Sequence, residues 1–222
     1  MALSKTVLYY TSNREKPEFE AKVRQTTLEN CGGIPIISVS QKPIDFGENI
    51  CVGDVGCSYV NAFRQILIGA KAAKTDYLYF AESDFLYPPA YFSFNPTGKD
   101  LYRYNNICIV FKKIYSRYYR KEFSIGAQVA KREFVVRELE IYLKDQPQWI
   151  DGPFRIQHPN GVIIPDWNDA PCEYFSTEVP CVSFKTGDGV AKSARTMPGA
   201  ENRLWTVPYW GEAQKLGEKY LL

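Results

Sequence analysis

The fold is decided by the stretch Tyr77-Leu78-Tyr79-Phe80-Ala81-Glu82-Ser83-Asp84, an apolar run that ends in two carboxylates separated by one residue. A short apolar run bounded by polar residues is typical of a buried strand in a parallel sheet. Such a strand delivers Glu82 and Asp84 to the edge of the sheet, where open α/β folds bind their ligands.

The spacing of the two acids indicates what they can bind. Residues i and i+2 of an extended segment point to the same side, so Glu82 and Asp84 can meet one target. Two oxygen donors on one side suit Mg²⁺ or Mn²⁺ carrying a substrate diphosphate. The alternative is a solvated strand end before a turn, because the sequence from Phe85 to Pro89 cannot continue an ordinary central strand.

Composition predicts a globular chain that uses carboxylates for its chemistry. The 222 residues are 45% hydrophobic and 23% charged, with a net charge of +2. No segment is long and apolar enough to span a bilayer, and no secretory signal is visible, so we expect a cytoplasmic location. Six scattered cysteines without a C-x-x-C pair, and His158 as the only histidine, favour free thiols over disulfides or a zinc site.

Strands and helices alternate in the N-terminal half. The sequence predicts strands over residues 6–11 and 34–40, a helix between them, and a second helix from about Ser58, before the strand that ends at Glu82. This order implies a parallel sheet with right-handed crossovers. Asn13, Ser40-Gln41 and Glu82-Asp84 should therefore converge at one edge, as expected for a nucleotide pocket.

Several segments together resemble a known enzyme family. The helix and strand over residues 63–84 are similar to the D-x-D region of nucleotide-sugar glycosyltransferases of the GT-A fold, and small phage-type members are most similar. The matching motifs are Gly53-Asp54-Val55-Gly56, the segment Glu82–Pro89 and Pro208-Tyr209-Trp210-Gly211. The resemblance implies a single Rossmann-like α/β domain over residues 1–222, with a mainly parallel central sheet flanked by helices. Its nucleotide-binding half would be 1–91, and its acceptor-side half, with a C-terminal lid, 92–222.

The resemblance also implies site residues. Asp84 would ligate Mn²⁺ or Mg²⁺, and Glu82, which replaces the usual Asp, would contact the metal or the donor ribose. A nucleoside-diphosphate sugar, by family analogy a UDP-sugar, would be held by three groups of residues and by Asp54. The expected donor-binding residues are Thr11, Ser12, Asn13 and Arg14 near the base, Arg64 near the phosphates, Lys185 and Lys192 in a closing segment, and Asp54.

The catalytic base is expected in the segment 149–179, which is rich in Pro, Gly, Asp and aromatic residues and predicts a long loop. Asp169 and Glu173 are the candidates that would deprotonate the acceptor if the reaction inverts the anomeric centre. His158 is either a third metal ligand, as late histidines are in GT-A enzymes, or a turn residue. Upstream, a helix is expected to follow Ser124 and run through Leu143, with Gly126 to Gln128 at the donor sugar.

The tract Lys112–Lys121 holds five cations and three tyrosines without an acid. It suits DNA phosphates with bases stacked on aromatic rings, but a charged strand facing solvent explains it as well. The resemblance to phage-type members implies a 5-hydroxymethylpyrimidine in DNA as the acceptor, in the host cytoplasm if the protein is phage-encoded. The alternative acceptor is a saccharide or lipid-linked glycan.

Two other function classes stay open. A sugar-1-phosphate nucleotidyltransferase shares the α/β nucleotide fold, but it typically has a Gly-rich loop after the first strand, where this chain has Thr11-Ser12-Asn13-Arg14. A non-catalytic nucleic-acid-binding protein would use Lys112–Lys121 but would leave the paired acids without a role.

Overall fold

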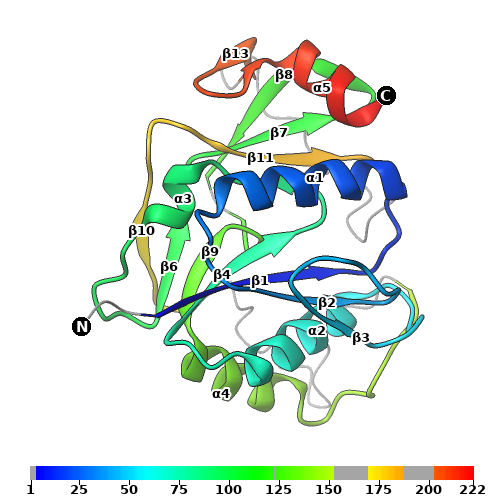
Figure 1. The fold of residues 1–222 in the computed structure, drawn as a ribbon, viewed down its shortest axis with the longest axis vertical. Helices are drawn as coiled ribbons and strands as arrows, with labels where there is room; N and C mark the ends of the chain where they lie inside the picture. Colours follow the sequence, from blue (N-terminus) through cyan, green and yellow to red (C-terminus); the bar gives the residue numbers. More distant parts are fainter. Residues whose placement is uncertain (1–3, 123, 153–169, 188–202) are drawn as a thin grey trace.

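The computed structural model describes residues 4–122, 124–152, 170–187 and 203–222. A seven-stranded sheet with the order β10-β6-β9-β4-β1-β2-β3 forms its centre (Figure 1). Only β9 runs antiparallel to its neighbours, so the prediction of a mainly parallel α/β sheet is confirmed. The strands are β1 (Lys5–Thr11), β2 (Ile36–Ser40), β3 (Glu48–Cys51), β4 (Tyr77–Glu82), β6 (Leu101–Tyr104), β9 (Gln128–Lys131) and β10 (Glu173–Phe175).

Helices cover both faces of the central sheet (Figure 1). On one face, α2 (Tyr59–Ala72) and α4 (Arg132–Leu143) share an apolar core with Leu8 and Leu78 of the central strands. On the other face lie α1 (Pro17–Asn30) and the short α3 (Pro89–Ser93). The nucleotide-binding half is therefore a layered α/β unit with its strand ends free to carry a site.

Local sequence explains how α2 is placed. Its N-cap is Ser58, whose hydroxyl accepts a hydrogen bond from the Asn61 N–H at 3.1 Å. At Gly69 the helix approaches the sheet closely, since a Cβ there would lie 2.2 Å from Leu8 Cδ1. A glycine at this position lets α2 pack directly on β1.

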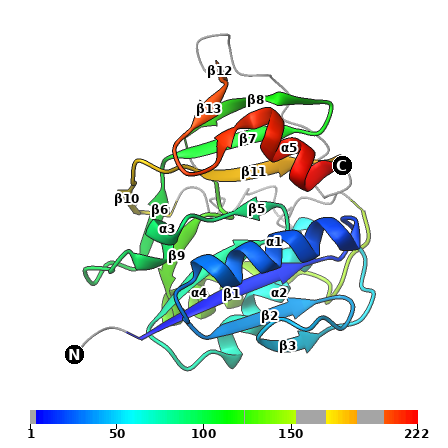
Figure 2. The same cartoon turned by 45° about the horizontal axis from the view of Figure 1, so that its top comes forward.

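A second sheet, of five strands in the order β12-β8-β7-β11-β5, lies next to the first (Figure 2). Its strands are β5 (Phe85–Leu86), β7 (Ile107–Phe111), β8 (Ile114–Lys121), β11 (Cys181–Lys185) and β12 (Arg203–Leu204). A small hairpin of β13 (Thr206–Val207) and β14 (Gly211–Glu212) leads into α5 (Ala213–Leu221).

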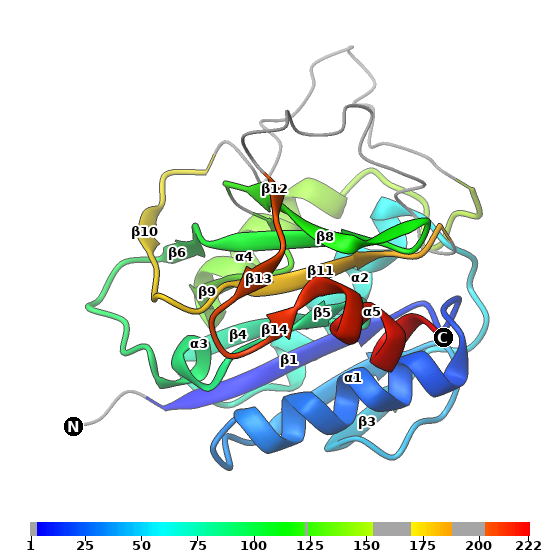
Figure 3. The same ribbon diagram turned by 90° about the horizontal axis from the view of Figure 1, so that it is seen from above.

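One face of the second sheet is closed by α1 and α5, which lie side by side (Figure 3). The rings of Phe19 in α1 and Phe184 in β11 meet edge to face at 5.4 Å, and Tyr220 of α5 stacks on Phe184. The first helix of the nucleotide-binding half is thus packed against the last helix of the chain.

The structure differs from the sequence predictions in β9, in β3 and in β10, which lies within the segment 149–179 predicted as a long loop. Residues 128–131, expected in or before a helix, form β9, and α4 begins only at Arg132. Val129 and Ala130 are buried in cores on opposite faces of the sheet, so their burial does not follow the one-sided pattern that sequence periodicity detects. The strand β3 was not predicted because Glu48–Cys51 is a short, half-exposed edge strand without an apolar run.

All six cysteines are unpaired, as expected. None of the helices in the described part of the chain combines the length and hydropathy that a bilayer crossing requires.

Candidate functional site

The paired acids lie at the carboxyl end of β4, as the sequence predicts. Glu82 is the last residue of the strand and is level with Tyr10 of β1, while Ser83 and Asp84 form the turn that leads into β5. The Tyr10 hydroxyl donates a hydrogen bond to Glu82 Oε1 at 2.6 Å. Neighbouring strands therefore hold the first acid in a fixed position at the sheet edge.

The Glu82 carboxyl fits closely against the backbone at Gly126. A Cβ on Gly126 would lie 2.4 Å from Glu82 Oε2, so glycine leaves the room that the carboxyl needs. The buried Tyr87 hydroxyl ties the two segments together: it accepts from the Glu82 N–H at 2.9 Å and donates to the Gly126 carbonyl at 2.5 Å. The segment expected at the donor sugar thus borders the first acid.

Asp84 is held by the second sheet. Its carbonyl accepts a hydrogen bond from the Phe184 N–H at 2.7 Å, next to the antiparallel pairing of β5 with β11. One residue further on, Lys185 Nζ lies 3.0 Å from Asp84 Oδ2, and both side chains are about one-fifth exposed, at 20% and 21%. The structure therefore brings Lys185, predicted at the donor phosphates, to the predicted metal ligand.

Charges and burial alter the protonation of this cluster. Burial and the charge of Asp84 raise the pKa of Glu82 to about 7, against the opposing effects of the Tyr10 hydrogen bond and the cations of Lys185 and Lys121. Burial alone would lower the pKa of Lys185, but the nearby Asp84 and Glu82 outweigh it, and the net shift is upward. Lys185 is therefore a fixed positive charge among the acids.

Sequence reasoning missed Glu15. The Thr186 hydroxyl donates to Glu15 Oε1 at 2.8 Å, which joins the end of β11 to the connection between β1 and α1. The two residues are 171 positions apart in the chain, and no local pattern indicates that they meet. This contact brings the Lys185 end of the second sheet to the loop expected to hold the base.

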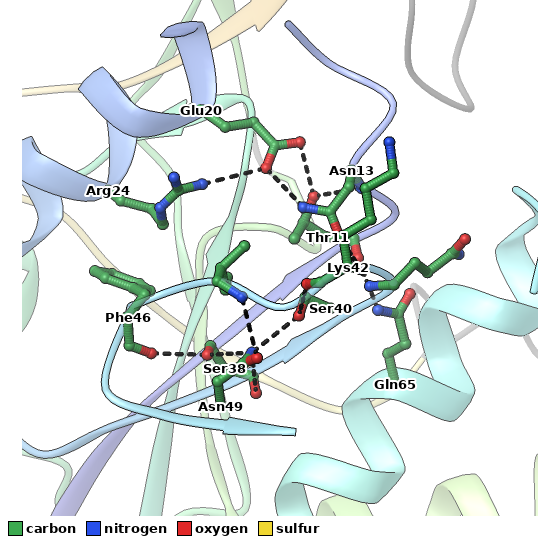
Figure 4. A network of polar contacts seen from close by, with 12 residues as sticks. Thr11, Asn13, Glu20, Arg24, Ser38, Ser40, Lys42, Phe46, Asn49 and Gln65 are labelled. Atoms are coloured by element: carbon green, nitrogen blue, oxygen red, sulfur yellow. Dashed lines mark hydrogen bonds and ion pairs between the residues drawn. The ribbon is translucent and has the colours of Figure 1, made fainter. Parts of the chain in front are cut away.

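A buried carboxylate organises that loop (Figure 4). Glu20 of α1, which is 2% exposed, accepts hydrogen bonds from the Thr11 hydroxyl at 2.9 Å and from Asn13 Nδ2 at 3.2 Å. Arg24 Nη1 lies 3.4 Å from the same carboxylate. Burial raises the pKa of Glu20, and these three partners oppose that rise by stabilising the charged form.

Asn13 connects the ends of two strands. Its φ of 51° lies in the left-handed region, which asparagine tolerates better than most residues. Its Oδ1 accepts hydrogen bonds from the backbone N–H groups of Gln41 and Lys42, both at 2.9 Å. The predicted convergence of the polar ends of β1, β2 and β4 is confirmed by these contacts and by the strand registers.

The segment around Asp54 lies against the same edge. Arg14 Nη2 and Asp54 Oδ1 are 3.1 Å apart, with side chains 43% and 70% exposed, so this pair adds at most about 1 kcal/mol to stability. Cys57 Sγ lies 3.6 Å from the Ser12 hydroxyl. Of the predicted donor-binding residues, Thr11, Ser12, Asn13, Arg14 and Asp54 are therefore brought together.

Arg64 is placed elsewhere, in a structural role. Its guanidinium donates hydrogen bonds to the carbonyl oxygens of Leu143, Gln146 and Pro147, at distances from 2.7 to 3.3 Å. These carbonyls lie at the C-terminal end of α4, where backbone acceptors lack helical partners. Arg64 therefore joins α2 to the end of α4, and this geometry does not support its predicted contact with phosphates.

Glu173 lies away from the acids. Glu173 pairs with Tyr102 of β6, and the register continues through Val129 of β9 to Tyr79 of β4. Glu173 therefore lies three strands away from β4 and level with Tyr79, three residues before Glu82. Its carboxylate is 3.3 Å from Lys99 Nζ. This placement does not support a role as catalytic base. Asp169, Lys192 and His158 lie outside the described residues.

The basic tract forms the turn between β7 and β8 and then β8 itself. Tyr118 and Tyr119 are 0% and 2% exposed, and Tyr115 packs against Gly217 of α5. Two of the three tyrosines expected to stack on bases are therefore core residues, which corrects that interpretation. Arg117 lies over the ring of the exposed Trp205, 4.4 Å from its centroid.

The acids suit a hard cation with few protein ligands. No group of three or more His, Cys, Asp or Glu side chains that could hold a metal occurs in residues 4–122, 124–152, 170–187 and 203–222. Mg²⁺ is commonly bound through one or two carboxylates together with water and substrate phosphates. Glu82 and Asp84 are two half-buried carboxylates at the sheet edge, and their present partners are the Tyr10 hydroxyl and Lys185 Nζ.

No family model and no curated protein matches the chain. Among solved structures, the inositol-1-phosphate CTP transferase from T. maritima matches with a TM-score of 0.50 and 13% identity, over 88% of this chain and 93% of that chain. A glycosyltransferase involved in the glycosylation of the major capsid of PBCV-1 matches with a TM-score of 0.47 and 10% identity, over 81% and 93%. At such low identity the match to the CTP transferase shows the fold alone. The chain has the GT-A-like α/β fold that the sequence predicts.

We expect Gly126→Ala to destabilise the protein by about 1–3 kcal/mol, because the added methyl group overlaps the Glu82 carboxyl. Shortening that side chain in Glu82→Asp should relieve the overlap. The double variant should then be more stable than the sum of the single effects by about 0.5–3 kcal/mol, measured by urea unfolding. Strictly additive effects would show that the two residues do not press on each other.

Proposed function

We propose that the protein transfers a sugar from a nucleoside-diphosphate sugar to an acceptor hydroxyl. One observation carries this proposal: a fixed cation, Lys185, lies beside two carboxylates at the strand edge where the loops after β1 and β2 meet. Acids that can share a divalent cation and a lysine that can meet phosphate are the groups that a diphosphate leaving group requires.

The proposed donor lies along this edge. Its base, uracil by the family resemblance, would contact the loop Thr11–Arg14 and Asp54, and its ribose would contact Glu82. Its diphosphate would then lie near Lys185, whose ammonium is already oriented by Asp84 at 3.0 Å. This arrangement uses the observed proximity of the three loops and needs no movement of the sheet.

Mn²⁺ or Mg²⁺ would be held by Asp84, and Glu82 would be either its second ligand or the partner of the ribose. When bound, the ion would supply positive charge where the leaving diphosphate develops negative charge, a stabilisation of several kcal/mol. Lys185 would act on the same oxygens as a second, permanent cation. Tyr10 would keep the Glu82 carboxyl in place through its 2.6 Å hydrogen bond.

In the proposed reaction the bond between the anomeric carbon and the diphosphate oxygen breaks, and its electron pair leaves with the nucleoside diphosphate. A new bond forms between the anomeric carbon and the acceptor oxygen, and the acceptor proton passes to a base. Asp169 is the remaining candidate for that base.

Nucleotidyl transfer is the competing chemistry on this fold. Its substrates would be a nucleoside triphosphate and a sugar phosphate, and its released product would be pyrophosphate. The loop after β1 supports sugar transfer over this alternative, because it is Thr11-Ser12-Asn13-Arg14 and is tied down by Glu20. A glycine-rich phosphate loop is absent from this position.

We expect calorimetric titration with Mn²⁺ present to detect binding of at least one nucleoside-diphosphate sugar to the protein. Incubation with that donor should then release nucleoside diphosphate and no pyrophosphate. Binding of nucleoside triphosphates with pyrophosphate release would identify a nucleotidyltransferase, and absence of binding to a complete panel of common nucleotide sugars would refute the proposal.

For the acids, we expect Asp84→Asn to lower turnover of that donor by about 100-fold, equivalent to roughly 2.7 kcal/mol of transition-state stabilisation. The substitution keeps the size of the side chain, so the melting temperature should change by only a few degrees. Asp100→Asn, which alters an exposed acid paired with Lys131, is the matched control and should keep full turnover. Full activity of Asp84→Asn would remove the metal role.

A second proposal concerns the acceptor. Lys113 and Lys121 are exposed on the hairpin of β7 and β8, and the charge of Lys121 influences Glu82. A DNA acceptor carrying 5-hydroxymethylpyrimidine would approach the acids past these cations. With the tyrosines buried, this contact would rest on phosphate neutralisation alone.

If DNA is the acceptor, two such contacts should make affinity for a hydroxymethylated duplex fall by roughly 12-fold between 50 and 200 mM salt. A double variant with glutamine at both positions should flatten this dependence in fluorescence anisotropy. Lys74→Gln, which removes an exposed cation after α2, serves as the control. A flat response of the unmodified protein would exclude DNA as the acceptor.

A further inference from the structure

A cavity of about 360 Å³ opens on the second sheet, outside the cluster of acids. This volume falls within the usual range of small-molecule pockets, about 300–1,000 Å³. Its lining combines amide, charged and apolar side chains, among them Asn105, Asn106, Arg120, Glu178, Leu204 and Pro208. Neither the paired acids nor the loop Thr11–Arg14 contributes to it.

One wall of the cavity, the segment 176–180, is fixed by side-chain hydrogen bonds. Asn106 Nδ2 donates to the Thr177 carbonyl at 2.8 Å, and the Tyr104 and Thr177 hydroxyls are 2.6 Å apart. Trp210 Nε1 donates to the Pro180 carbonyl at 2.7 Å. This wall is therefore formed before any ligand arrives.

The opposite wall is the segment 204–208. Leu204 pairs with Tyr118 where β12 joins β8, and the Trp205 carbonyl accepts from the Ala213 N–H at 2.9 Å. The pairing of β13 with β14 closes this segment into a hairpin. Two rigid walls reduce the ordering cost that a weak ligand would have to overcome.

The cavity and the acids lie on either side of one strand. Successive residues of a strand point to opposite faces. In β8, Arg120 lines the cavity, whereas Lys121 is close enough to Glu82 to influence its pKa. We infer that a chain-like ligand in the cavity would reach the acids past the end of β8, the strand that carries both Arg120 and Lys121.

The chemistry of the lining selects the ligand class. Arg120 is balanced by Glu178, so the cavity offers no excess of positive charge for a nucleic-acid backbone. The two asparagines and the Thr206 hydroxyl can exchange hydrogen bonds with ligand hydroxyls, while Leu204, Val207 and Pro208 provide an apolar surface. Sugars present this combination, with hydroxyl groups at the rim of the ring and C–H groups on its faces.

We propose that this cavity binds an uncharged saccharide and anchors the acceptor glycan remote from its reacting hydroxyl. The anchoring role rests on the proposed sugar transfer, whereas saccharide binding itself does not. The cavity thereby favours a glycan over DNA as the acceptor.

The test uses the labelled full-length protein on an array of neutral oligosaccharides, with calorimetry on the glycans that bind. Asn105→Trp fills the cavity from an exposed position, and Arg120→Gln removes its charged donor. Each should weaken binding by at least about tenfold, Asn105→Trp because the indole occupies the space of the ligand and Arg120→Gln because a charge-assisted hydrogen bond is lost. Lys74→Gln removes an exposed cation after α2, away from the cavity, and should leave glycan binding unchanged.

Binding of no glycan on the array, or equal binding by the parent and both cavity variants, would overturn the proposal. Preferential binding of single-stranded DNA, weakened equally by Arg120→Gln and Lys113→Gln, would also overturn it and identify a nucleic-acid surface. Turnover assays with nucleotide sugars on the same variants separate saccharide binding in the cavity from sugar transfer at the acids. Donor turnover without glycan binding refutes the saccharide site alone. Glycan binding without donor turnover refutes the transfer reaction alone.

Discussion

The candidate site depends on the attachment of the second sheet to the end of β4 through Asp84. The Asp84 carbonyl accepts the Phe184 N–H at 2.7 Å, and its carboxylate holds Lys185 Nζ at 3.0 Å. With both side chains about one-fifth exposed, at 21% and 20%, desolvation offsets much of the attraction, so the pair contributes more to position than to stability. The acid and the cation that would meet a diphosphate are consequently at a set distance before any ligand binds.

The second constraint is the buried Glu20 carboxylate, which gives the other half of the edge its shape. A carboxylate that is 2% exposed is costly unless hydrogen bonds compensate it, and Thr11, Asn13 and Arg24 do so. Asn13 then has its Oδ1 available for the loop after β2. Because Glu15 lies in the same connection and accepts from Thr186, the loop after β1 is linked to β11 as well. The attachment at Asp84 and the buried Glu20 carboxylate together therefore fix the segments on both sides of the acids.

The sequence predicts the parts of this structure that depend on local patterns. The apolar run before Glu82, the helix start at about Ser58 and the order of strands and helices are local signals, and they correctly place the polar strand ends at one edge. Contacts between distant segments leave no such signal. Asp84 and Lys185 are 101 residues apart, so only the family resemblance suggested that they share a site. The helical position of Arg64 does not show from sequence whether the side chain binds phosphates. The structure shows that it binds carbonyl groups at the end of α4.

The basic tract shows how composition can misrepresent a surface. Read along the sequence, Lys112–Lys121 is one cluster of cations and tyrosines, but a strand distributes successive side chains between two environments. Tyr118 joins the core beneath α5, Tyr119 packs on Phe111, Arg120 lines the cavity, and the charge of Lys121 acts on Glu82. A nucleic acid on one face would therefore meet only some of these cations. A ligand that passes around the end of β8 would meet both Arg120 and Lys121, which is why the geometry of this strand suits a flexible, uncharged chain better than a polyanion.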